Sequence, residues 1–172
     1  MGKSLAVIDL NLNNKAGDVA ASLLDLKRFL NAVPASVEHV PGVLIRVIGT
    51  DLPVTMWTPL TKEVSSYFEE LHFLMEKVNQ PILGVAFGHL GPLGTRLVRS
   101  CDVVWAQTTA TFSTNEIGLD IPAHRAELVG LVIKQVFTAA QLGSECMAWA
   151  RELAKLDVTQ LLSVKIDLVS QK

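Results

Sequence analysis

The sequence has little charge and few cysteines. Of its 172 residues only 19% are Asp, Glu, Lys or Arg, and the formal net charge is −2. A surface that binds nucleic acid needs clustered excess Lys and Arg, so this balance argues against a nucleic-acid partner. The two cysteines, Cys101 and Cys146, stand in unrelated contexts. We therefore expect two unpaired thiols and a reducing, cytoplasmic compartment.

Long apolar runs and metal-binding spacings are also missing. No run approaches the roughly 20 apolar residues of a membrane span, so we expect no membrane insertion. His39, His72 and His124 lack the spacing of metal ligands, so we expect no metal site. By contrast, hydrophobic residues make up 49% of the chain and the mean hydropathy is +0.36. These values favour a large core or an apolar surface covered by another subunit.

Apolar periodicity predicts strands and helices that alternate along the chain. Strands are expected where short aliphatic runs end in turn residues, at 4–12, 43–48, 82–87, 103–106 and 110–112. Amphipathic helices are expected at 19–33 and 60–78, with a shorter one around 97–101. This order predicts an α/β layer with right-handed crossovers. We expect one domain, residues 1–172, with a core at 1–122 and a helical C-terminal part at 123–172.

The most informative stretch joins the strand at 82–87 to the helix that follows it. Gly88, Gly91 and Gly94 recur every three residues in the connecting turn. Such a turn places backbone N–H groups at a helix N-terminus, where the helix dipole favours negative charge. The spacing departs from the Walker and dinucleotide patterns. The turn therefore favours an oxyanion hole, and the alternative is a tight turn without chemistry.

This stretch resembles the centre of the crotonase superfamily, which comprises the enoyl-CoA hydratases and isomerases. Residues 110–119 resemble the family's Ala-x-Phe-x-x-x-Glu-x-x-Leu segment, and 43–49 and 126–132 are more weakly similar. The resemblance implies a superhelix of stacked β-β-α turns, an acyl-CoA or acyl-carrier pantetheine substrate with no separate cofactor, and a homotrimer or hexamer. It also implies that Gly88 and Gly91 contact the thioester. The residues shared around the turn are Pro81, Gly88, Gly91, Gly94, Cys101 and Asp102.

Departures from the family pattern bear on the reaction. The resemblance places one hydratase glutamate at Glu116 and the other at Arg96, and it places an oxyanion amide at Leu93, beside Gly94. The first oxyanion loop signature is missing at 51–57, and the segment between 119 and 126 is short. Hydration needs two carboxyl groups, and Arg cannot give up a proton at neutral pH. A single base can still isomerise a double bond, so the sequence favours an isomerase with Glu116 as base and amides near Leu93 and 54–57 as oxyanion donors.

Two other interpretations stay open. Arg96 can bind a substrate carboxylate, and Gly88-His89 resembles crotonase-like decarboxylases of polyketide branching pathways, whose dehydratase partners also act on acyl-carrier-protein substrates. Alternatively, Arg96 is a solvated helix residue and His89 a turn histidine bonded to the backbone. The lost glutamate and the short segment also fit a non-catalytic crotonase-like protein that binds a thioester or acts through subunit contacts.

Overall fold

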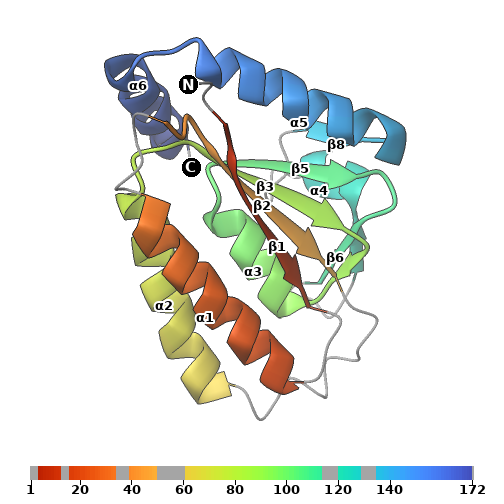
Figure 1. Cartoon of the computed structure of the whole chain (residues 1–172). Helices are drawn as coiled ribbons and strands as arrows, with labels where there is room; N and C mark the ends of the chain where they lie inside the picture. The colour runs from red at the N-terminus through yellow and green to blue at the C-terminus, as the bar shows by residue number, and fades with distance from the viewer. Residues whose placement is uncertain are drawn as a thin grey trace.

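The computed structural model describes residues 4–12, 16–33, 39–49, 61–113, 120–128 and 135–171. Two sheets and the helices around them make up the fold (Figure 1). The parallel sheet A has the order β1-β2-β3-β5-β8, with strands Ala6–Asn11, Val43–Ile48, Ile82–Phe87, Val103–Gln107 and Gln135–Phe137. Sheet B has the order β4-β6-β7, with strands His89–Leu90, Thr111–Ser113 and Asp120–Pro122. The helices are α1 (Ala16–Ala32), α2 (Thr61–Lys77), α3 (Pro92–Ser100), α4 (Ala123–Leu128), α5 (Ala139–Ala154) and α6 (Val158–Ser170).

Sheet A is buried on both faces, as the aliphatic runs of its central strands require. Along β3, Ile82 and Ala86 enter a core shared with α1, α2 and α3, whereas Leu83 and Val85 face the opposite side. Helix α5 covers that opposite side, where Trp149 packs with the second cluster. Figure 1 shows α5 on one side of the sheet and α1 and α2 on the other. The predicted strands and helices of this layer are therefore confirmed, although α1 begins three residues before the predicted start at 19 and α3 begins five residues before the predicted start at 97.

The C-terminal part is helical, as expected, but it also contains a strand. Residues 135–137 form β8, which pairs in parallel with β5 at Trp105, Ala106 and Gln107. Three residues are too few to show the alternation of apolar and polar residues that indicates a strand, so the sequence pattern did not predict β8. Helix α5 covers a face of sheet A within the same chain. The division of the chain at residue 123 stays a prediction.

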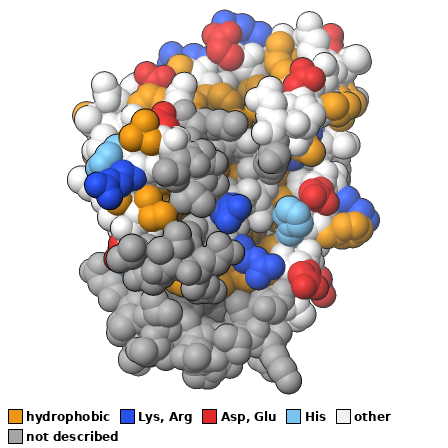
Figure 2. Space-filling model, turned by 180° about the vertical axis from the view of Figure 1, so that it is seen from behind, with side chains coloured by type: hydrophobic (Ala, Val, Ile, Leu, Met, Phe, Trp, Pro, Cys, Tyr) orange, Lys and Arg blue, Asp and Glu red, His pale blue; other side chains and the backbone are white. Residues whose placement is uncertain are grey.

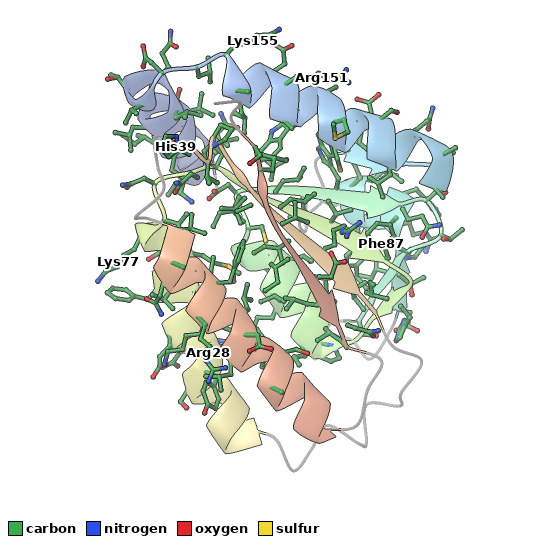
Figure 3. The ribbon with its side chains drawn as sticks, in the orientation of Figure 1. Arg28, His39, Lys77, Phe87, Arg151 and Lys155 are labelled. Atoms are coloured by element: carbon green, nitrogen blue, oxygen red, sulfur yellow. The ribbon has the colours of Figure 1, made fainter. Side chains whose placement is uncertain are left out.

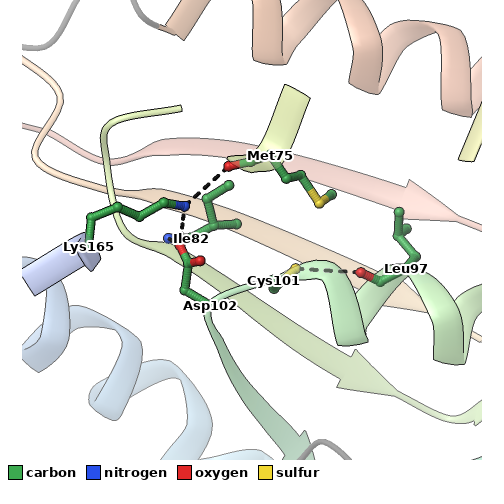
Figure 4. A network of polar contacts seen from close by, with 6 residues as sticks. All are labelled: Met75, Ile82, Leu97, Cys101, Asp102 and Lys165. Carbon is green, nitrogen blue, oxygen red and sulfur yellow. Dashed lines mark hydrogen bonds and ion pairs between the residues drawn. The ribbon is translucent and has the colours of Figure 1, made fainter. Parts of the chain in front are cut away.

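A buried ion pair attaches α6 to the amino end of sheet A (Figure 4). Lys165 Nζ lies 2.6 Å from Asp102 Oδ2 and donates a second hydrogen bond to the Met75 carbonyl at 3.2 Å. The Ile82 N–H donates to the same carboxylate oxygen at 2.8 Å. Both charged side chains are more than nine-tenths buried, at 8% and 2% exposure. Asp102 and Lys165 together therefore join α2, β3 and α6 just before β5, at the opposite end of β3 from the glycine-rich turn.

Replacing Lys165 by methionine is expected to lower the free energy of unfolding by about 3–5 kcal/mol, because it leaves the Asp102 carboxylate buried without its cation. The double variant Asp102→Asn, Lys165→Met should lose less than Lys165→Met alone. Lys155→Met is the matched control: Lys155 pairs with Glu152 on the surface, so its loss should cost at most about 1 kcal/mol. Urea denaturation measures all three. Equal small losses for Lys165→Met and Lys155→Met would contradict the anchoring role.

Candidate functional site

The candidate site lies at the carboxyl ends of the central strands of sheet A, the edge where open parallel sheets bind ligands. Figure 3 shows Phe87 at this end of β3 and His39 near the opposite end. The Gly49 N–H, just after β2, donates to the Phe87 carbonyl at 2.8 Å. A Cβ on Gly49 would lie 2.0 Å from the His89 carbonyl oxygen, so only glycine lets the end of β2 approach β4 this closely.

The turn after β3 depends on Gly88, whose φ is +66°. This is the left-handed region, which glycine adopts without steric cost. The Gly88 carbonyl accepts a hydrogen bond from the Thr111 N–H at 3.0 Å, which ties the turn to β6. The chain thereby leaves sheet A, forms β4 and enters α3 within a few residues.

The first turn of α3 presents the two amides that the sequence singled out. Gly91 is the N-cap and Pro92 the first helical residue, and Thr95 N–H donates to the Gly91 carbonyl at 2.9 Å. Leu93 and Gly94 precede Thr95, so their N–H groups have no carbonyl within the helix to bond. Gly91 has no side chain to cap them, and the first turn holds no acidic residue. Leu93 has a negative φ, since no described residue other than Gly88 has a positive one.

His89 is bonded by side chains, not by the backbone as the turn-histidine interpretation expected. Its Nδ1 lies 2.7 Å from Thr111 Oγ1 and 3.7 Å from Asp120 Oδ2. Ser113 Oγ donates to the other oxygen of Asp120. Sequence reasoning missed Thr111, Ser113 and Asp120. Thr111 and Ser113 flank the buried Phe112, and this alternation of polar and apolar residues indicates a strand with one polar face. It does not show which residues of other strands lie beside them.

Arg96 is exposed on α3, three residues after Leu93, and therefore lies next to it on the helix surface. Its guanidinium carbon stands 5.5 Å from the centroid of the Phe68 ring, a cation–π contact with α2. No carboxylate among the described residues pairs with it. Arg96 is thus held over an aromatic ring rather than simply solvated. On the face shown in Figure 2, basic, acidic and apolar side chains are interspersed.

Two predicted parts of the site lie outside the described residues. One is Glu116, which belongs to residues 114–119 between β6 and β7 in the sequence, and the other is the first oxyanion amide near 54–57. The structure thus brings Gly88, His89, Gly91, Leu93 and Gly94 together within one turn and helix start, with Arg96 one turn further along α3.

Cys101 is buried and Cys146 half-buried, and the two are not joined by a disulfide. Burial raises the pKa of the Cys146 thiol, an effect that Arg46 partly opposes and Glu145 reinforces. Cys146 therefore stays protonated at neutral pH and is a poor nucleophile. Within the described ranges no group of three or more His, Cys, Asp or Glu could hold a metal ion. None of the described helices is long and apolar enough to cross a membrane.

Comparison with known proteins identifies the fold. No protein-family model and no curated protein matches the sequence. Among solved structures, human enoyl Coenzyme A hydratase domain-containing protein 3 is 20% identical with a TM-score of 0.72, covering 95% of this chain and 75% of that one. A monofunctional enoyl CoA isomerase from Mycobacterium smegmatis is 18% identical with a TM-score of 0.74, covering 98% and 90%. A methylmalonyl CoA decarboxylase is 16% identical with a TM-score of 0.74, covering 99% and 78%. The chain therefore has the crotonase fold that the resemblance implied.

Gly88→Ala is expected to lower the free energy of unfolding by about 1–2 kcal/mol, the cost of a side chain in the left-handed region. No described atom lies within 4 Å of the added Cβ, so the backbone conformation accounts for the loss. Gly91→Ala is the control, because Gly91 is equally open but has a φ of −60°. Its loss, measured by the same denaturant titration, should be less than half as large. Indistinguishable losses would contradict the role assigned to the Gly88 conformation.

Proposed function

We propose that this protein isomerises the double bond of an acyl thioester, carried by CoA or an acyl-carrier pantetheine, through an enolate. The supporting observation is a pair of amides at the start of α3, Leu93 and Gly94, which have no hydrogen-bond acceptor among the described residues and lie at the carboxyl end of sheet A in the crotonase fold. Backbone N–H donors aimed at a thioester oxygen stabilise the charge that develops there, and one such donor typically lowers the barrier by about 2.7–4 kcal/mol.

In the proposed reaction a base breaks the C–H bond next to the thioester carbonyl, and the electron pair moves onto the thioester oxygen. The resulting dienolate takes a proton two carbons further along, which shifts the double bond. We assign the base to Glu116, because the resemblance places it there. A single carboxylate can carry the proton between both carbons. Hydration is disfavoured because the resemblance puts Arg96 at the position of the second carboxylate, and Arg cannot donate a proton at neutral pH.

Decarboxylation is a second candidate, and Arg96 supports it. Its guanidinium is held over Phe68 and has no carboxylate partner among the described residues. A guanidinium fork binds a carboxylate in bidentate fashion, as a malonyl-type thioester would require. The bond between the α-carbon and the carboxylate breaks, carbon dioxide leaves, and the electron pair forms a thioester enolate whose oxygen the same amides would stabilise before a proton adds to the α-carbon. Such a substrate can also be carried by an acyl-carrier protein, as in polyketide branching.

Self-association into a trimer or hexamer is part of the proposal. Several large apolar side chains are exposed on the C-terminal helices: Leu128 is 83%, Ile166 66% and Met147 56% exposed. Apolar surface of this kind is usually covered by a partner. A cytoplasmic location stays a prediction.

Glu116→Gln is expected to lower kcat by about 10²–10⁴-fold with enoyl thioesters, because glutamine cannot accept the proton. Turnover is measured with both double-bond positions, and Glu127→Gln, an exposed substitution on α4, is the control. Malonyl-type thioesters test the second candidate in the same assay. Unchanged turnover in Glu116→Gln would remove Glu116 as the base. Absence of turnover with every thioester, together with no rise in melting temperature on adding CoA, would favour a non-catalytic protein.

A further inference from the structure

The strand register of sheet B gathers polar side chains on one face. β4 pairs in parallel with β6 so that His89 stands beside Thr111, and β6 pairs with β7 so that Ser113 stands beside Asp120. Successive side chains of a strand point to opposite faces, so these four residues share one face of the sheet. Their alternating neighbours lie on the other face, against the core: Leu90, Phe112 and Ile121.

Two hydrogen bonds and one longer charged contact link the side chains of this polar face to the His89 imidazole. Ser113 Oγ donates to Asp120 Oδ1, which fixes the carboxylate. Asp120 Oδ2 then lies 3.7 Å from His89 Nδ1, and Thr111 Oγ1 lies 2.7 Å from the same nitrogen. The His89 side chain is 24% exposed, so the ring is largely enclosed but open to solvent on one side.

This arrangement favours one tautomer of His89. An ionised carboxylate only accepts hydrogen bonds, so Asp120 favours a proton on Nδ1, which donates to Thr111 Oγ1. Nε2 then carries the lone pair and has no partner among the described residues. In histidines that transfer protons, a hydrogen bond at one ring nitrogen usually fixes the tautomer, and the other ring nitrogen exchanges the proton.

We propose that His89 is a second proton-transfer residue of this site, and that Asp120 and Thr111 position it. The proposal rests on the enolate reaction proposed above. Only Leu90, Gly91 and Pro92 separate His89 from Leu93, whose amide lies in the first turn of α3. Glu116 accepts the proton as the C–H bond next to the carbonyl breaks and the electron pair moves onto the thioester oxygen. The His89 imidazolium, facing Asp120, then gives the proton on Nε2 to the far carbon, and His89 takes a new proton from solvent while Glu116 releases its own.

Solvent exchange separates this mechanism from transfer by a single enclosed base. In D2O, the wild-type product should contain solvent deuterium, because the His89 proton exchanges before delivery. His89→Gln should lower the deuterium content of the product at least fivefold and kcat about tenfold. Asp120→Asn should lower both partly, and Asp120→Glu should restore them toward wild type. His72→Gln replaces an exposed histidine of α2 and is the control, with no expected change. Unchanged deuterium content in His89→Gln would overturn the proposal.

A second measurement tests the positioning without catalysis. Nitrogen-15 NMR of the His89 ring in the full chain should show the proton on Nδ1 in the wild type and a shift toward the Nε2–H form in Asp120→Asn. An unchanged tautomer in that variant would overturn the role of Asp120. If the wild type turns over no thioester, the proposed function and the proton transfer by His89 both fail, whereas the NMR result still decides whether Asp120 sets the tautomer.

Discussion

The pairing of β3 between β2 and β5 is the constraint on which the rest of the structure depends. It buries residues 82–86 completely, with helices over both faces of the sheet. Polar side chains are unfavourable along a strand enclosed in this way, because each buried polar group would need a hydrogen-bond partner. Polar groups therefore lie beyond its ends. At the carboxyl end the Gly88 turn opens toward α3 and sheet B, and at the amino end Asp102 receives Lys165.

The two ends carry different tasks. At the amino end a buried ion pair joins α6 to the sheet, and its Lys165 ammonium also bonds the Met75 carbonyl. At the carboxyl end the amides of Leu93 and Gly94 and the Nε2 atom of His89 are left without partners among the described residues. Groups that lack internal partners are the ones available to a ligand. Stability and the proposed chemistry are thus separated along the length of one strand.

The departures from the crotonase sequence pattern affect backbone groups and side-chain groups differently. Oxyanion donors that belong to the backbone survive a change of side chain, so leucine at position 93 keeps its N–H. Proton-transfer groups belong to side chains, so the resemblance, which puts Arg96 where the family has a carboxylate, implies a change in the possible reactions. A fold shared at 15–20% identity with hydratase, isomerase and decarboxylase structures is therefore compatible with a different set of acid and base groups.

The sequence by itself determined the central strands and helices and the glycine turn after β3, because apolar period and turn residues act over a few positions. Its resemblance to the crotonase superfamily implied the fold. Tertiary structure decided what is brought together from a distance: Asp102 and Lys165 are 63 residues apart, and His89 and Thr111 are 22 apart. β8 likewise exists because β5 offers it an edge, and three residues carry no period of their own. These pairings depend on strand register and on how the helices pack on the sheet. The pattern of neighbouring residues in the sequence determines neither.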